Sequence, residues 1–288
     1  KGWLGEISKN KNLEIVYGDI RDENFTNKLI KGCDIVYHLA ALISIPYSYV
    51  STKSFIETNI NGTHNILQGC LQNKISKLIV TSTSEVYGTA QQKKIDETHI
   101  LNAQSPYAAT KTAADQLSMS FYYTYGLPVC ILRPFNTYGP RQSLRAIIPT
   151  IIKQLITSKN YIKLGDISTT RDFTYIDDTI SGFLSVLNSK KCIGKVINIS
   201  ANQEVKISVI LKILKSLMNQ NNIKVLTDKK RLRPKNSEVY RLHADTSNAK
   251  KYLNWHPKYK GKDGLLKGLK KTIKWFLDQD IENLKKKK

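Results

Sequence analysis

The first half of the chain alternates short apolar runs with longer segments of helical pattern. Such an alternation is typical of a parallel sheet that helices cover on both faces. The expected strands are residues 13–17, 34–38, 77–81 and 128–132. The helices expected between them are residues 23–31, 51–73 and 106–125. The pattern therefore predicts an α/β fold with a doubly wound parallel sheet.

The second half, from about residue 138, mixes short strands with helices and many charged residues. The strands expected there are residues 161–164, 196–199 and 223–226. This mixture predicts a smaller α+β lobe. Because no Pro/Gly/Ser-rich hinge separates the halves, we expect the two lobes to share an interface.

Length and composition favour a folded protein over a disordered chain or a membrane protein. The 288 residues are 41% hydrophobic, which is enough for a core. No apolar run reaches the roughly 18 to 20 residues that a membrane span needs, and residues 1–3 do not begin a signal peptide. We therefore expect a cytoplasmic protein without a membrane partner.

Cysteine and histidine spacing gives no sign of a metal site. The four cysteines are Cys33, Cys70, Cys130 and Cys192. They stand far apart, without a C-x-x-C pair or a histidine at ligand spacing, which indicates reduced, buried thiols. His38 ends an expected strand, and we interpret it as a structural residue.

The chain is strongly basic, with 45 Lys and Arg against 23 Asp and Glu and a formal charge of +22. Such an excess can indicate nucleic-acid binding. The lysines are spread along the chain, however, and the dense run 285–288 is typical of a solvated end. We expect no nucleic-acid partner, and we expect the charge to attract a substrate that carries a diphosphate.

Polar clusters follow each expected strand of the first half, at the point where the strand ends. They are residues 18–19, 40–41, 82–85 and 133–136. A doubly wound sheet binds its ligands at the carboxyl ends of its strands. We therefore expect these clusters to share one crevice.

Residues 105–111, Ser-Pro-Tyr-Ala-Ala-Thr-Lys, form the sharpest local motif. Ser105 can cap a helix, and Pro106 suits its first position. Tyr107 and Lys111 then lie one turn apart on the same face. An ammonium beside a phenol lowers the pKa of the phenol, so Tyr107 can act as a base near neutral pH. The alternative is a surface tyrosine beside a lysine, because this spacing alone also arises by chance.

A hydroxyl-rich turn, residues 81–88, follows one of the expected strands and precedes this helix. Two successive strand ends can present hydroxyls, a carboxylate and a phenol to the same crevice. The alternative for this turn is ordinary capping by Ser and Thr. With Tyr107 nearby, the turn offers candidates for chemistry.

One expected part of a dinucleotide-binding fold is absent. No G-x-G-x-x-G turn joins a first strand to a first helix, although the later parts of such a fold are present. We therefore expect a Rossmann-like sheet that is incomplete at its amino terminus. A segment of about 40 to 50 residues, the length of one βαβ unit, is expected to precede the chain.

Taken together, the motifs resemble those of the extended short-chain dehydrogenase/reductases that act on nucleotide sugars. The resemblance is carried by residues 19–20, 38–41, 59–63 (Asn-Ile-x-Gly-Thr), 83–88, Tyr107-x-x-x-Lys111, 133–141, 170–173 and 231–239. It covers nearly the whole chain, and the missing glycine-rich turn is the one departure.

This resemblance implies NAD as the cofactor and a nucleotide-diphosphate sugar as the substrate. The cofactor-binding residues that it implies are Asp19, Ile20, Leu39, Ala40, Ala41, Asn59, Tyr107, Lys111 and Phe135. The implied substrate-binding residues are Thr83, Asn136, Arg171, Arg233 and Glu238. Guanidinium forks suit phosphate, and a carboxylate suits paired ribose hydroxyls. Each single arginine could equally form a surface ion pair.

The implied catalytic residues are Thr83, Ser84, Glu85, Tyr107 and Lys111. In this family the C4 position is oxidised while the tyrosine takes the O4 proton. Glu85 can then remove the C5 proton while Ser84 relays a proton to the departing C6 hydroxyl, which favours a 4,6-dehydratase. Residues 40–49 and 137–149 look most like those of the dehydratases of the legionaminic-acid pathway, which act on a nucleotide-linked N-acetylglucosamine. UDP or GDP is the expected carrier.

Three alternatives remain at this point: a UDP-glucuronate decarboxylase, a nucleotide-sugar 4-epimerase, and a non-catalytic regulator that senses the cofactor. The expected NAD-binding domain is residues 1–137, rejoined by about 174–192. The expected substrate-binding lobe is residues 138–173 and 193–288. By analogy with relatives, the helices 51–73 and 106–125 would form the face of a homodimer.

Overall fold

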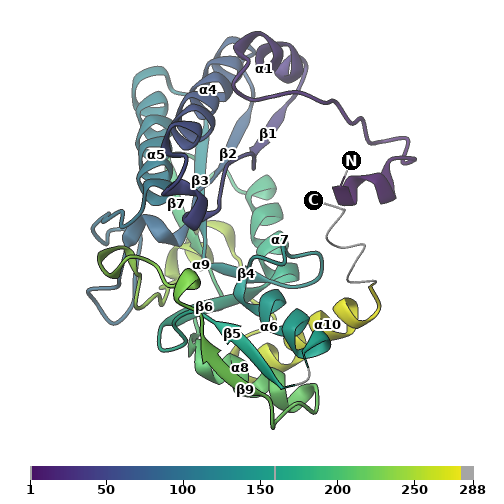
Figure 1. Cartoon of the computed structure of the whole chain (residues 1–288). Helices are drawn as coiled ribbons and strands as arrows, with labels where there is room; N and C mark the ends of the chain where they lie inside the picture. The colour runs from purple at the N-terminus through teal and green to yellow at the C-terminus, as the bar shows by residue number, and fades with distance from the viewer. Residues whose placement is uncertain (1, 159, 280–288) are drawn as a thin grey trace.

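The structure, a computed structural model, describes residues 2–158 and 160–279. Within these residues the strands form one four-stranded sheet, one three-stranded sheet and one two-stranded sheet (Figure 1). The basic run 285–288 lies outside the described residues. No helix of the described part is long and apolar enough to cross a membrane.

The four-stranded sheet is parallel and has the strand order β1-β2-β3-β7. Its strands are β1 (Ile35–His38), β2 (Lys77–Thr81), β3 (Val129–Pro134) and β7 (Lys195–Ile199). In its register Thr81 pairs with Leu132, so the carboxyl ends of β2 and β3 lie next to each other. The polar residues that follow these two strands are therefore brought to the same edge of the sheet.

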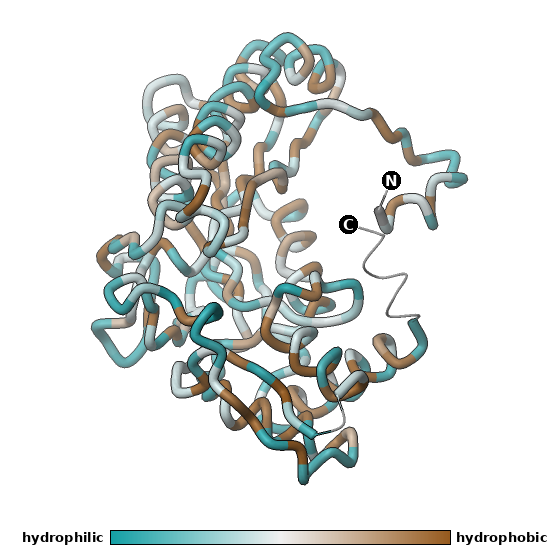
Figure 2. Tube along the Cα trace, in the orientation of Figure 1, coloured by the Kyte–Doolittle hydropathy of each residue, from teal (hydrophilic) through white to brown (hydrophobic). Residues whose placement is uncertain are grey.

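The strands of this sheet are largely hydrophobic (Figure 2), and β2 and β3 are buried almost throughout because helices cover both faces. One face packs against α1 (Glu23–Ile30), α4 (Gly62–Gln72) and α5 (Pro106–Tyr125). The opposite face packs against the end of α7 (Ile176–Ser185) and against α9 (Ser247–Leu253). This arrangement confirms the predicted α/β fold with a covered parallel sheet.

The second half of the chain builds the two smaller sheets. Strands β4 (Asn136–Tyr138), β6 (Thr170–Tyr175) and β8 (Glu204–Lys206) form one, and β5 (Tyr161–Leu164) and β9 (Lys224–Thr227) form the other. A separate apolar core joins them to α6 (Ile147–Thr157), α8 (Ile207–Leu217) and α10 (Gly261–Leu277). The mixture of short strands and helices agrees with the α+β character expected from the sequence.

Two expectations about secondary structure need correction. Residues 13–17 form no strand, and most of them are exposed. A strand needs a hydrogen-bonded neighbour, and none of the described strands pairs with this segment. The expected helix 51–73 is also uneven, because π-helical residues Ile56–Asn61 separate α3 (Thr52–Phe55) from α4. The widened turn contains Asn59, one of the candidate site residues.

The expected lobe boundaries remain a prediction, but two elements lie elsewhere than they imply. Strand β7 follows residue 193, yet it pairs with β3 and extends the larger sheet. Helix α9 packs against the same sheet. The apolar strand pattern could show that β7 forms, whereas its neighbour in the sheet is a matter of tertiary pairing.

Lys77 shows how the end of the sheet away from these polar turns is stabilised. Its buried ammonium donates to the carbonyls of Val186, Leu187 and Ser189, at 2.6, 3.2 and 2.9 Å. These carbonyls belong to the short helical segment Val186–Asn188 that follows α7 and to the residue after it, at the carboxyl end of this helical stretch. A lysine charge is favourable at such a position.

Candidate active site

The helix that carries the tyrosine and the lysine begins as the sequence predicted. The Ser105 side chain accepts a hydrogen bond from the Ala108 amide at 3.1 Å, and Pro106 occupies the first turn of α5. Tyr107 and Lys111 follow on this helix, and both side chains are buried. The alternative of a surface tyrosine beside a lysine is therefore wrong.

The expected effect of Lys111 on Tyr107 is also wrong for this structure. Burial raises the pKa of Tyr107, a hydrogen bond with Thr83 lowers it, and the charges of Glu85 and Asp115 raise it further. Lys111 instead donates from Nζ to the Thr81 carbonyl at 2.6 Å. Burial has the opposite effect on Lys111, whose pKa it lowers, and the charge of Asp115 partly offsets that lowering. For these two buried groups, the effect of desolvation on the pKa is larger than the effect that their spacing on the helix led us to expect.

The turn that follows β2 lies beside Tyr107. Thr83 caps the short helical segment Ser84–Tyr87, because its Oγ1 accepts from the Glu85 amide at 3.2 Å. Ser84 and Glu85 are buried, and Thr83 is half-buried. Since Thr83 hydrogen-bonds Tyr107 and the Glu85 charge acts on the same phenol, these three side chains share one site.

Glu85 also contacts a group of alternating charges from the second half of the chain. Arg233 Nη1 lies 3.4 Å from Glu85 Oε2 and 3.8 Å from Glu238 Oε1. Arg171 Nη2 lies 3.2 Å from the same Glu238 oxygen. Burial lowers the pKa of Arg171, the nearby Arg233 charge acts in the same direction, and the two carboxylates oppose it. The structure thus joins the candidate base to three of the candidate substrate ligands.

Asn136 lies near the junction of the two lobes, at the start of β4. Its Oδ1 atom is buried and has no hydrogen-bond partner among the described residues. The preceding Phe135 is buried, and its amide donates to the Ile199 carbonyl of β7 at 2.9 Å. An unpaired buried amide oxygen is costly, which marks Asn136 as a group with an unused binding capacity.

Of the residues predicted to bind the cofactor, Asp19 lies at the surface and Ile20 is half-buried. Asp19 is exposed, and its carboxylate accepts from Arg21, with 2.6 Å between Oδ2 and Nη2. These hydrogen bonds lower the pKa of Asp19 to about 2. Ile20 packs closely on α4, where a Cβ atom on Gly62 would lie 2.6 Å from Ile20 Cδ1. Asp19 is therefore ionised at neutral pH, and the close contact between Ile20 and Gly62 fixes the backbone next to it.

The loop after β1 is anchored by Asn59. The Asn59 side chain accepts from the Leu42 amide at 2.8 Å and donates to the Leu42 carbonyl at 2.9 Å. It also donates to Thr110 Oγ1 of α5 at 3.1 Å. Leu39 and Ala40, at the start of this loop, are exposed, and Ala41 is half-buried. Asn59 thus fixes the loop relative to the helix of Tyr107.

His38 is buried at the end of β1, and its environment supports the structural role expected for it. Its Nε2 lies 2.9 Å from Thr63 Oγ1, which itself donates to the Asn59 carbonyl at 2.6 Å. Burial and the charge of Lys111 lower the pKa of His38 to about 3. The ring is therefore neutral at physiological pH.

This environment predicts a loss of stability in mild acid. The unfolded chain gains a proton at His38 as the pH falls below about 6.5, whereas the folded chain does not until about pH 3. The free energy of unfolding should therefore decrease by about 2 kcal/mol between pH 7 and pH 5 from this residue alone. Urea unfolding of the wild type and of His38→Asn at both pH values measures the difference. An equal decrease in both proteins would contradict the prediction.

Comparison with known proteins shows to which family the chain belongs. The sequence model of the GDP-mannose 4,6 dehydratase family matches residues 3–267. The chain belongs to this family. Human dTDP-D-glucose 4,6-dehydratase is 33% identical over 95% of this chain and 77% of its own length. The UDP-N-acetyl-alpha-D-glucosaminuronate decarboxylase of Bacillus cytotoxicus is 32% identical over 94% of this chain and 85% of its own length.

Solved structures of the nucleotide-sugar dehydratases and epimerases have the same fold. UDP-glucuronic acid 4-epimerase from Bacillus cereus, in complex with UDP-glucuronic acid and NAD, has a TM-score of 0.86 and is 31% identical, covering 95% of this chain and 84% of that one. DesIV from Streptomyces venezuelae, a dTDP-glucose 4,6-dehydratase, also has a TM-score of 0.86 and is 28% identical, covering 96% and 83%. These findings confirm the resemblance to extended short-chain dehydrogenase/reductases.

Sequence reasoning assigned no role to four buried polar residues of this family member. They are Tyr87, Asp115, Arg133 and Asn198. They form one hydrogen-bonded group next to the catalytic candidates. The spacing of Asp115, four residues after Lys111, placed it on the same helical face and was the available signal. The partners of Asp115 come from other elements, which the spacing could not show.

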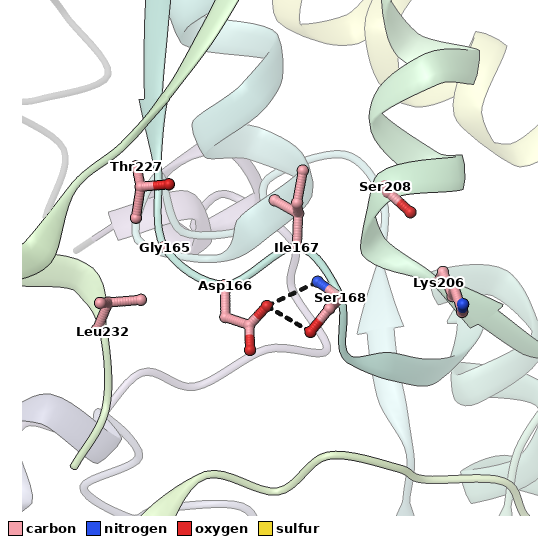
Figure 3. Close-up of a pocket in the computed structure, with 8 residues that line it drawn as sticks. All are labelled: Gly165, Asp166, Ile167, Ser168, Lys206, Ser208, Thr227 and Leu232. Atoms are coloured by element: carbon pink, nitrogen blue, oxygen red, sulfur yellow. Dashed lines mark hydrogen bonds between the residues drawn. The ribbon is translucent and has the colours of Figure 1, made fainter. Parts of the chain in front are cut away.

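A surface pocket lies beside the loop between β5 and β6 (Figure 3). Its lining residues are Gly165, Asp166, Ile167, Ser168, Lys206, Ser208, Thr227 and Leu232. None of the predicted site residues lines it, although Leu232 directly precedes Arg233. Asp166 accepts from the amide and the hydroxyl of Ser168, both at 2.7 Å, which occupies its carboxylate within the loop. Among the described residues, no cluster of three or more His, Cys, Asp or Glu could hold a metal ion.

Proposed function

We propose that this chain is an NAD-dependent 4,6-dehydratase of a nucleotide-linked hexose, with UDP- or GDP-N-acetylglucosamine as the leading substrates. The product would be a 4-keto-6-deoxy sugar. The observation that supports this most strongly is that the Tyr107 phenol is hydrogen-bonded by Thr83 and also feels the charge of Glu85. Oxidation at C4 needs the phenol, whereas elimination of water additionally needs a base for the C5 proton.

The residues that face the site fit a dinucleotide cofactor. Lys111 donates to the Thr81 carbonyl, and an ammonium carries three N–H donors, so two remain for the hydroxyls of a ribose. The exposed Leu39 and Ala40 offer an apolar surface at the end of β1, beside the loop that Asn59 anchors. When bound, NAD would accept a hydride from C4 of the sugar and return it to C6.

The protein's own side chains would move three protons. Tyr107 Oη takes the O4 proton during oxidation, and Thr83, which hydrogen-bonds Tyr107, orients O4. The resulting ketone makes the C5 hydrogen acidic. Glu85 takes that proton as the C6–O bond breaks, and Ser84 supplies the proton with which the hydroxyl leaves as water. Glu85, after its proton exchanges with solvent, returns a proton to C5 as the hydride returns to C6. One water is lost in all, and the cofactor ends in its starting oxidation state.

The charges around Glu238 suit the nucleotide end of such a substrate. Arg171 and Arg233 approach the same carboxylate oxygen from different segments. Two guanidinium groups this close repel each other, so an added phosphate anion would be favourable. We propose that they bind the diphosphate together with Asn136, whose side-chain N–H groups can donate to a phosphate oxygen, and that Glu238 binds the ribose.

Uronate decarboxylation is the second candidate. It is supported by the decarboxylase relative and by Arg233, which lies beside Glu85 and could bind the carboxylate of a sugar acid. Epimerisation at C4 would use Tyr107 without a base for C5. The presence of both Tyr107 and Glu85 disfavours a non-catalytic regulator.

Two further proposals concern the state of the protein. Tyr123 and Tyr125, at the end of α5, are 75% and 56% exposed. These exposed aromatic side chains support a homodimer whose interface is formed by α4 and α5. We also propose a cytoplasmic location, in agreement with a nucleotide-sugar substrate. Sedimentation of the purified protein measures whether it is a dimer.

The decisive experiment is NMR of the product that the full-length protein forms from each candidate sugar with NAD in heavy water. We expect a 4-keto-6-deoxy product that carries deuterium at C5. Carbon dioxide release from UDP-glucuronate would favour the decarboxylase, and inversion at C4 would favour the epimerase. Either result without dehydration would refute the proposed reaction.

A further inference from the structure

A buried ion pair joins α5 to β3 next to the residues of the proposed site. Arg133 Nε and Nη2 lie 3.0 and 2.9 Å from Asp115 Oδ2, and both side chains are at most 3% exposed. The same oxygen accepts from Ser82 Oγ at 2.7 Å. Asp115 Oδ1 is buried and has no partner in the described part of the chain. One carboxylate oxygen therefore binds three donors from two neighbouring strand ends.

The ion pair continues into the turn that carries Ser84 and Glu85. Arg133 Nη1 donates to the Tyr87 hydroxyl at 2.9 Å, and the guanidinium lies 4.8 Å from the centre of the Tyr87 ring. The Tyr87 hydroxyl in turn donates to Asn198 Oδ1 at 2.8 Å. Tyr87 is the last residue of the helical segment that Thr83 caps. Arg133 thus makes both a hydrogen bond to the Tyr87 hydroxyl and a cation–π contact with the Tyr87 ring.

Each end of this group lies next to a different part of the proposed chemistry. Asp115 is one helical turn beyond Lys111, and it opposes the effect of burial on that ammonium. Ser82 directly precedes Thr83, and Tyr87 ends the turn of Glu85. The helix of Tyr107 and the turn of Glu85 are therefore connected through one guanidinium.

Stability alone does not explain such an arrangement. A buried ion pair regains little more than the cost of desolvating its two charges, and apolar side chains of similar volume often stabilise a fold as well or better. A guanidinium fork, by contrast, fixes its partners in direction and distance. This property matters when reacting groups on two elements must be aligned, because small displacements cause large losses of rate.

We infer that Asp115 and Arg133 are positioning residues, whose ion pair holds Tyr107 and Lys111 in register with Thr83 and Glu85. The inference deepens the proposed dehydratase function and rests on its site. Tyr87 is the link between the ion pair and the turn. None of these three residues contacts the sugar in this assignment; they act through the residues that do.

The test compares three variants with the wild type in the full-length protein. Arg133→Lys keeps the charge and removes the fork, and Tyr87→Phe keeps the ring and removes the hydroxyl. Asp115→Asn alone leaves Arg133 buried without a counter-charge and can unfold the protein, so it is combined with Arg133→Gln. Each variant should lower the kcat of C4 oxidation by about 10-fold or more, with less than a threefold change in KM for the nucleotide sugar.

Lys77→Met is the matched control for a merely structural role. Lys77 is also a buried cation of the same sheet, but it lies at the first residue of β2, at the other end of the strand from Ser82. Its variant should lower the melting temperature while the kcat of the folded protein stays unchanged. Hydrogen exchange of residues 83–88 gives a readout besides activity, because it should increase in Arg133→Lys and Tyr87→Phe and not in Lys77→Met.

The outcomes separate this inference from the proposed function. If the wild type inverts C4 instead of eliminating water, the dehydratase is refuted, but the rate of C4 oxidation still tests the positioning role. If the folded Arg133→Lys and Tyr87→Phe proteins oxidise C4 at the wild-type rate with unchanged exchange in the turn, the positioning role is refuted. A loss of kcat with increased exchange of residues 83–88 in Arg133→Lys and Tyr87→Phe, and not in Lys77→Met, supports it.

Discussion

Replacing Glu85 by glutamine should stop formation of the 4-keto-6-deoxy product while C4 oxidation continues. Glutamine has nearly the same shape but cannot take the C5 proton. General-base catalysis contributes about 10²- to 10⁴-fold, and we expect kcat for dehydration to fall within this range. NMR in heavy water should show C4-oxidised sugar that retains its C6 oxygen, with no deuterium at C5.

Glu238→Gln is the matched control for this substitution. Both carboxylates contact Arg233, so each variant removes one negative charge from the same cluster. In our assignment Glu238 binds ribose, and its loss should raise KM with little effect on exchange at C5. Wild-type turnover by the Glu85 variant would remove the basis for dehydration at this site.

Replacing Tyr107 by phenylalanine should abolish C4 oxidation itself. The ring would still fill its buried position, but no group would remain to take the O4 proton, and we expect a loss of about 10²- to 10⁴-fold in kcat. No C4-oxidised sugar should appear, even in the Glu85→Gln background. Tyr37→Phe is the control, because Tyr37 also loses one hydrogen bond, to the Phe183 carbonyl at 3.0 Å, on the other face of the sheet.

The pKa of Tyr107 adds a direction to this prediction. Because burial raises it, the phenol is protonated at neutral pH, and the basic form becomes more populated as the pH rises. The wild-type rate of C4 oxidation should therefore increase with pH across the neutral range. A rate that falls as the pH rises would show that Tyr107 is not the base.

Much of the fold follows from local patterns in the sequence. The apolar runs predicted β2 and β5 at their observed bounds, and Ser105 with Pro106 predicted the start of α5. The prediction for residues 13–17 was wrong, because an apolar run shows which residues can form a strand but not whether a neighbour pairs with them. The position of β7 was missed for the same reason.

The candidate site was only partly predictable. The spacing of Tyr107 and Lys111 and the hydroxyl-rich turn were visible in the sequence, and the family resemblance supplied Arg171, Arg233 and Glu238. The direction of the Tyr107 pKa could not be predicted, because it depends on how deeply the ring is buried. The contact between Arg233 and Glu85 joins residues far apart in the chain, which no local pattern encodes.

By itself, the sequence determined most of the element types, the start of the helix that carries Tyr107 and Lys111, and the chemical groups available at the strand ends, because capping, periodicity and residue type are local properties. Only the tertiary structure decided which charges meet. Arg133 of β3 reaches Asp115 and Tyr87, and Arg233 reaches Glu85, because parallel pairing brings the strand ends together and the second half of the chain packs over them. Burial at that junction then sets the proton affinities, since desolvation acts on whichever groups the packing encloses.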